Sequence, residues 1–73
     1  MKIFTVISAC ATEDGQAPIP AVMTYLDKAR ADCHVQDTLE CSEFINESFT
    51  IQMFEFDTET GEQRGVYNYE KSI

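Results

Sequence analysis

The stretch Ser48-Phe49-Thr50-Ile51-Gln52-Met53-Phe54-Glu55-Phe56-Asp57 is the clearest strand in the sequence and decides the fold. Up to Met53 its apolar residues alternate with polar ones, which is the period of a half-buried strand. At Phe54 the phase changes, and the apolar residues move to the even positions. Either a β-bulge near this point lets consecutive residues serve one face, or the strand is apolar on both faces and a partner chain covers one of them.

Three further strands are expected around this one. Residues 2–11 carry apolar side chains on both faces, which predicts a central strand. Residues 17–23 contain two prolines, which are compatible with an extended edge strand and not with a central one. Residues 57–63 read as a hairpin loop in which Gly61 takes the left-handed conformation. Residues 66–69 return as the last strand.

The main helix is expected over residues 25–35. Thr24 and Asp27 have the spacing of a capping box, so Thr24 is the predicted N-cap. Leu26, Ala29 and Cys33 then follow on one helical face, which would be the face that packs on the sheet. Beyond this helix, Asp37 could cap a second short helix near residues 38–46, with one apolar face formed by Cys41, Phe44 and Ile45.

These elements predict a single α+β domain spanning residues 1–73. The expected fold is a small antiparallel sheet of three to four strands, in the order β-β-α-β-β, with the main helix packed on one face. A chain this short buries only about 60% of the surface that its unfolded form exposes, so its core is small. Oligomerisation or docking on a partner is a common source of additional stability in such domains.

Charge is the strongest global signal. The sequence has thirteen Asp and Glu against five Lys and Arg, for a net charge of −8, and residues 31–63 contain no Lys or Arg. Direct nucleic-acid binding needs the opposite sign, because affinity there comes from neutralising phosphates. Adhesion to an anionic membrane is disfavoured for the same reason. A field of one sign over part of the surface would instead attract a basic partner.

No constellation of residues indicates catalysis, a cofactor or a metal. Three cysteines, Cys10, Cys33 and Cys41, are interpreted as buried thiols of a protein in a reducing cytoplasm. His34 adjoins Cys33, but neighbours in a helix point apart and the spacing is not that of a zinc site. No base is placed to activate a thiolate, and His34 is expected to lie partly exposed at a helix end.

We therefore expect a binding protein, not an enzyme, with no cofactor. In the first hypothesis, spaced carboxylates occupy a basic groove on a nucleic-acid-processing protein and exclude the nucleic acid. The candidate partner-binding residues are Asp37, Glu40, Glu43, Glu47, Glu55, Asp57, Glu59 and Glu62. In the alternative hypothesis, the acids serve only solubility, and the chain is a protein-interaction or homodimeric subunit module that uses an exposed apolar strand face.

In its length, its acidity and its β–α–ββ layout, the chain resembles small phage-encoded inhibitors of host defence, such as anti-CRISPR and DNA-mimic proteins. The resemblance extends over the whole chain. It implies a protein of the host cytoplasm whose target is another protein. Those proteins share no motif, so the resemblance assigns no role to any individual residue.

Overall fold

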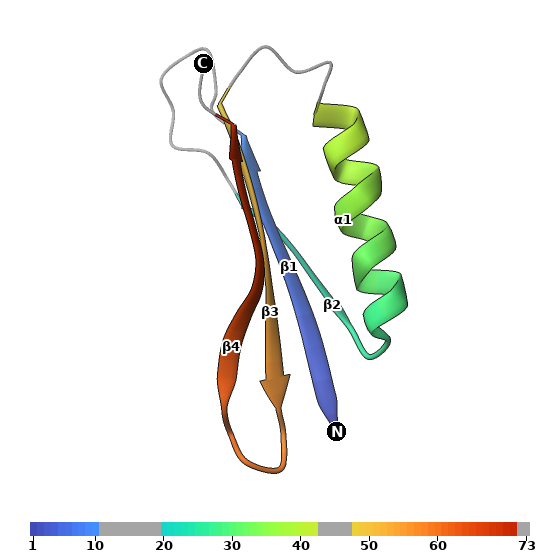
Figure 1. Cartoon of the computed structure of the whole chain (residues 1–73), viewed down its shortest axis with the longest axis vertical. Coiled ribbons are helices and arrows are strands. Elements are labelled where there is room, and N and C mark those ends of the chain that lie inside the picture. Colours follow the sequence, from blue (N-terminus) through green and yellow to red (C-terminus); the bar gives the residue numbers. More distant parts are fainter. Residues whose placement is uncertain (11–19, 43–47, 72–73) are drawn as a thin grey trace.

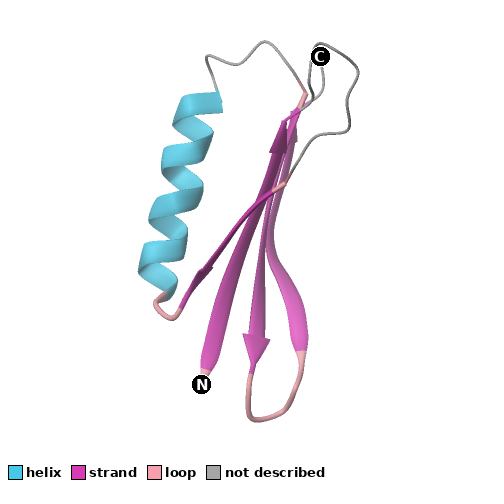
Figure 2. Ribbon diagram, turned by 180° about the vertical axis from the view of Figure 1, so that it is seen from behind, coloured by secondary structure: helices cyan, strands magenta, loops and turns pink. Residues whose placement is uncertain are grey.

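The described residues form four strands and one helix, in the order β-β-α-β-β that the sequence predicts (Figures 1 and 2). A computed structural model of the protein describes residues 1–10, 20–42 and 48–71. The elements are β1 (Lys2–Cys10), β2 (Ala21–Tyr25), α1 (Lys28–Ser42), β3 (Phe49–Asp57) and β4 (Gln63–Lys71). The α+β class and the single helix layer are confirmed.

The strands form one antiparallel sheet in the order β2-β1-β3-β4. β1 is central, as its apolar side chains on both faces predict, and it pairs with β3 along the whole length from Lys2↔Asp57 to Cys10↔Phe49. β2 is an edge strand of only five residues, and β4 is the other edge. The prediction of an edge strand in this part of the chain is confirmed for residues 21–23, while residues 17–19 lie outside the described residues.

The phase change in β3 has a definite structural cause. The pairing of β3 with β1 is regular throughout, so Met53 and Phe54 point to opposite faces of the sheet. The irregularity lies in the pairing with β4, where Met53 faces Tyr67 and Phe54 faces Gly65. Val66 is therefore the extra residue of a β-bulge. A bulge is present where the sequence predicts one, but it is formed by β4, and β3 itself is apolar on both faces.

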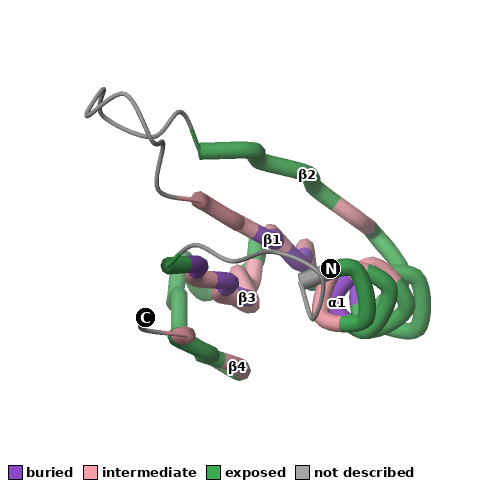
Figure 3. Tube along the Cα trace, turned by 90° about the horizontal axis from the view of Figure 1, so that it is seen from above, coloured by how far each residue is buried: buried purple, intermediate pink, exposed green. Residues whose placement is uncertain are grey.

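The hydrophobic core lies between α1 and one face of the two central strands (Figure 3). β3 contributes Phe49, Ile51 and Met53, and β1 contributes the buried Phe4 and Val6. The helix closes the core with Ala31 and Val35, while Leu39 packs partly against it. The opposite face of the sheet has no covering element among the described residues, since α1 contacts β1, β2 and β3 from one side only.

The helix differs from the prediction in its start and in its buried face. Asp27, and not Thr24, is the N-cap, because its Oδ1 accepts a hydrogen bond of 3.0 Å from the backbone N–H of Ala29. Thr24 instead pairs with Thr5 in the sheet. The face of α1 that packs on the sheet consists of Ala31, Val35 and Leu39, which are four residues apart. The residues predicted for this face, Leu26, Ala29 and Cys33, are exposed.

The prediction of a second helix was wrong for residues 38–42, which continue α1 to Ser42 without a break. No cap is needed at Asp37, because it lies inside a continuous helix. Residues 43–46, including Phe44 and Ile45, lie outside the described residues. Cys41 is exposed.

The β3–β4 hairpin confirms the predicted turn. Gly61 has a φ of 75° and its N–H donates to the carbonyl of Asp57 at 2.8 Å. That conformation is strained for any residue with a Cβ, which explains the glycine. β4 begins at Gln63, earlier than predicted, so Gly65 lies inside the strand at the bulge.

The cysteines are less buried than predicted. Cys33 and Cys41 are exposed on α1, because the packed face of the helix runs through Ala31 and Val35. Cys10 is half-buried and packs against the edge of the core.

Candidate functional site: the acidic groups and the open sheet face

The predicted partner-binding acids fall into two groups at opposite ends of the molecule. Asp37 and Glu40 lie in the second half of α1, which runs away from the β3–β4 hairpin (Figure 1). The hairpin group consists of Glu55, Asp57, Glu59 and Glu62. The two remaining candidates, Glu43 and Glu47, lie outside the described residues. Among the described residues, the acids of the linear run therefore do not form one continuous surface.

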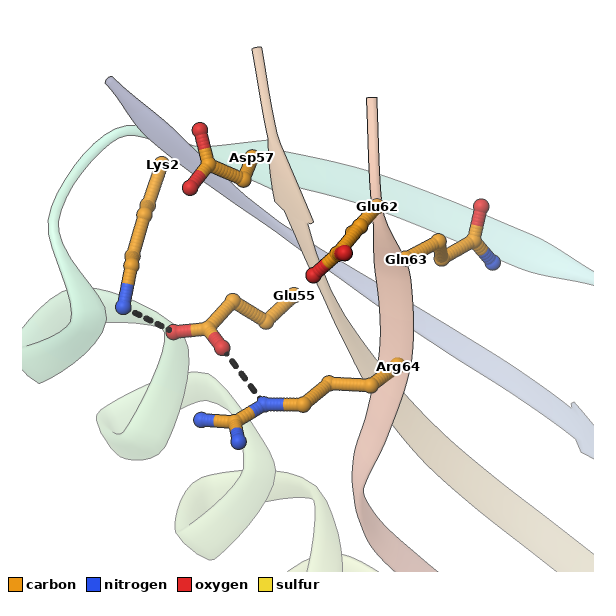
Figure 4. Close-up of a pocket in the computed structure, with 6 residues that line it drawn as sticks. All are labelled: Lys2, Glu55, Asp57, Glu62, Gln63 and Arg64. Carbon is orange, nitrogen blue, oxygen red and sulfur yellow. Dashed lines mark hydrogen bonds and ion pairs between the residues drawn. The ribbon is translucent and has the colours of Figure 1, made fainter. Parts of the chain in front are cut away.

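Glu55 is held by two of the chain's own cations (Figure 4). The register places Arg64 opposite Glu55, and the Arg64 Nε donates to Glu55 Oε2 at 2.7 Å. Lys2 reaches the other carboxylate oxygen from β1, with its Nζ 3.4 Å from Oε1. The Glu55 side chain is only 11% exposed. This carboxylate therefore joins three strands and is not available to a partner without breaking these contacts.

The pKa of Glu55 reflects this environment. Partial desolvation acts to raise the pKa, because it disfavours the charged form. The hydrogen bond and positive charge of Arg64, followed by those of Lys2, outweigh this effect and hold the pKa of Glu55 below its ordinary value of 4.5. Glu55 is therefore ionised wherever the protein is near neutral pH, as the bridge requires.

Asp57 organises the hairpin turn. Its Oδ1 accepts a hydrogen bond of 2.9 Å from the backbone N–H of Glu59. This bond lowers the pKa of Asp57, against a smaller opposing effect of desolvation, and the N–H of Thr60 and the positive charge of the chain's amino group lower it further. Asp57 has the role of a turn-forming Asx residue.

A hollow of about 390 Å³ lies beside these groups. Its lining residues, shown in Figure 4, are Lys2, Glu55, Asp57, Glu62, Gln63 and Arg64. The charges of three carboxylates and two cations nearly cancel in this hollow. A further positive charge, the amino group of Met1, lies 3.6 Å from the neighbouring Glu59. The hairpin end is consequently a largely self-neutralised surface, despite its high content of acidic residues.

The acids of α1 are placed differently. Asp37 and Glu40 are exposed, and neither has an ion pair within the described part of the chain. By contrast Asp32, one turn earlier, is 3.6 Å from Lys28. The last turn of α1 contains no basic residue. Because the carbonyl end of a helix carries partial negative charge, a carboxylate such as Glu40 is electrostatically unfavourable there.

A contact that the sequence did not predict joins β2 to α1. The Tyr25 hydroxyl lies 2.7 Å from His34 Nδ1, and the two rings meet edge to face at 86° with centroids 5.7 Å apart. Both groups can donate or accept, so the tautomer of the imidazole sets the direction of this hydrogen bond. His34 is half-buried as expected, but it lies inside the helix and not at its end. The contact fixes the helix against the edge strand, and only the pairing of β2 with β1 brings the two residues together.

The face of the sheet opposite α1 is here named the open face. Strand alternation and the observed register assign to it Ile3, Thr5, Ile7, Ala9, Val22, Thr24, Thr50, Gln52, Phe54, Phe56, Gln63, Gly65, Asn68 and Glu70. Glu70 is the only charged residue among these described positions. The paired charges of Lys2, Glu55, Asp57 and Arg64 all lie on the other face.

Within the described residues, no group of three or more His, Cys, Asp or Glu side chains could hold a metal ion. The same part of the chain contains no helix with the length and apolar character needed to cross a membrane. Comparison with known proteins gave no match to a family model, to a curated protein or to a solved structure.

Proposed function

We propose that this chain is a small acidic binding protein that masks a basic, nucleic-acid-binding surface on another protein. It would act by occupying that surface and not by catalysis. The observation that carries the proposal is the exposure of Asp37 and Glu40, without ion pairs in the described residues, at the carbonyl end of α1. A host-cytoplasm protein with an inhibitory role, of the kind found among phage-encoded inhibitors of host defence, would have this property.

Electrostatics supports the choice of a basic partner. The negative end of the helix dipole and the two carboxylates reinforce one another, and no basic residue in the last turn offsets them. A cationic surface docking there would relieve a repulsion that the isolated protein retains. Of the hairpin acids, Glu55 and Glu59 already pair with cations of the chain, so they contribute less to such a contact.

The test is a pull-down from host-cell lysate with the tagged protein, eluted by a salt gradient. We expect a nucleic-acid-binding protein to be retained at low salt and released as salt rises, because exposed charge pairs are screened. Added nucleic acid should compete with the captured protein for that partner. A partner that stays bound at high salt, or one that binds the chain and nucleic acid together, would contradict masking of a basic surface.

Two charge-reversal variants make the test specific to α1. Asp37→Lys with Glu40→Lys should abolish capture, mainly by slowing association. Glu59→Lys with Glu62→Lys is the matched control, because it changes the net charge by the same amount at exposed hairpin positions. We expect the control to retain most of the binding. Equal loss in both variants would show that total charge, and not the α1 surface, determines capture.

A further inference from the structure

The open face has the composition of a buried surface. In an antiparallel sheet with one covered face, the solvent face is ordinarily polar and charged. Here Ile3, Ile7, Phe54 and Phe56 lie on the central strands of that face, and Val22 on β2 is 55% exposed. The ring of Phe54 also extends over Gly65 of the next strand, since a Cβ at Gly65 would be 3.9 Å from Phe54 Cε1.

The molecule exposes more surface than a compact monomer of its mass would. The chain exposes 5222 Å², whereas a compact monomer of its 8.3 kDa mass would expose about 4600 Å². Its radius of gyration is 13.3 Å, against about 11 Å for a compact domain of this length. The molecule measures 42 × 22 × 15 Å and is therefore long and thin. This excess of roughly 600 Å² belongs to the molecule as a whole, and it approaches the 800 Å² or so that one partner buries in a stable interface.

Charge selects the occupant of the open face. A copy of this chain carries a net charge of −8, so two copies repel one another over most of their surfaces. The open face is the exception, because Glu70, on the edge strand, is its only charged residue among the described positions. A basic partner would gain nothing from this neutral face. Two copies meeting there would direct their α1 helices outward.

We propose that the open face is the interface of a homodimer, in which the sheets of two copies pack face to face about a two-fold axis. Such a contact is isologous, with the same residues contributed by each copy. Aligned sheets pack about 10 Å apart, with side chains of the two inner faces interdigitating. The phenylalanines of β3 and the isoleucines of β1 would then form a second core. This inference goes beyond the proposed masking function and does not depend on it.

The test compares two identical substitutions at different positions. Gln52→Lys places a cation in the middle of the open face, where Gln52 pairs with Ile7 and Asn68. Gln36→Lys places the same cation on the exposed side of α1 and changes the net charge equally. Sedimentation equilibrium from about 1 μM to about 500 μM would give the mass of each protein. At the upper end of this range we expect twice the 8.3 kDa monomer mass for the wild type and Gln36→Lys, whereas Gln52→Lys should keep the monomer mass throughout.

A second measurement requires no variant. The thermal midpoint of the wild type should rise with protein concentration, because dimerisation stabilises the folded state by mass action. Loss of the dimer in Gln52→Lys, with an unchanged far-UV circular dichroism spectrum, would support the proposal. A wild type that is monomeric with a concentration-independent midpoint would overturn it, as would a dimeric Gln52→Lys. A monomer whose open face instead binds a different protein, with binding lost in Gln52→Lys, would also overturn it.

Discussion

Truncation of Ile51 should distinguish the covered face of the sheet from the open one. Ile51 is fully buried near the start of β3, where it faces α1 between Ser8 of β1 and Tyr69 of β4. Ile7 lies on the adjacent strand with its side chain on the open face, and it is only partly buried. The two residues have the same side chain and differ mainly in what covers it.

The magnitudes follow from burial. Ile51→Ala removes three buried carbon atoms and leaves a cavity that the sheet and helix fill only in part, at a cost of about 2–5 kcal/mol. Ile51→Val should cost about 0.5–1.5 kcal/mol. Ile7→Ala removes the same atoms from a half-exposed site, so its cost in the monomer should be roughly 1 kcal/mol. A domain of this length has a total stability of roughly 4–11 kcal/mol, so Ile51→Ala removes a large share of it.

Urea unfolding followed by circular dichroism measures these differences. The experiment should be done near 1 μM, or about the lowest concentration that gives a signal, so that dimerisation adds little to the apparent stability. Equal costs for Ile7→Ala and Ile51→Ala at that concentration would refute the assignment of faces. If the open face is a dimer interface, the cost of Ile7→Ala should grow as the concentration is raised, while that of Ile51→Ala stays large throughout.

Three further predictions concern local features. Asp27→Ala should lower the stability by about 1 kcal/mol through loss of the helix cap, whereas Thr24→Ala should cost less. A larger effect of Thr24→Ala in thermal unfolding would indicate that Thr24 is the N-cap, as the sequence predicts. Gly61→Ala should cost about 1–2 kcal/mol because of its positive φ, while Gly65→Ala meets only an ordinary contact and should be neutral or slightly stabilising, as urea midpoints would show. The lowered pKa of Glu55 means that its bridge contributes stability above pH 4.5 that is lost as the pH falls through the folded-state pKa. Glu55→Gln should therefore lower the stability at pH 7 and reduce the loss of stability on acidification. An equally steep loss of stability in acid for the wild type and Glu55→Gln would argue against the bridge.

Local patterns predicted most of the fold because each element carries its own signal. The period of two in β3, the apolar β1 and the left-handed Gly61 depend on neighbouring residues only. The helix start was missed because Thr24 and Asp27 both have capping side chains, and the pairing of Thr24 with Thr5 decides between them. The spacing of Ala31, Val35 and Leu39 was a signal for the packed helical face that could have been found.

The candidate site was less accessible to sequence reasoning, because it depends on strand register. Glu55 lies in a run without basic residues, yet Arg64 from β4 and Lys2 from β1 reach it across the sheet. Linear charge segregation therefore overestimated the negative surface at the hairpin. The contact of Tyr25 with His34 is equally non-local, since it requires the edge strand to run back along the helix.

The distribution of charge also connects the two proposals. A strongly acidic chain could have placed its paired charges on the solvent face of the sheet, where they would keep copies apart. Instead the Lys2–Glu55–Arg64 bridge lies on the helix side of the sheet. Among the described positions, Glu70 is the only charged residue on the open face. Dimerisation through that face would leave both α1 helices outward, each presenting Asp37 and Glu40. A dimer would then offer two acidic surfaces to a basic partner, and linked contacts bind more tightly than either alone. If both proposals hold, Gln52→Lys should weaken capture of a multivalent basic partner while leaving each α1 surface intact.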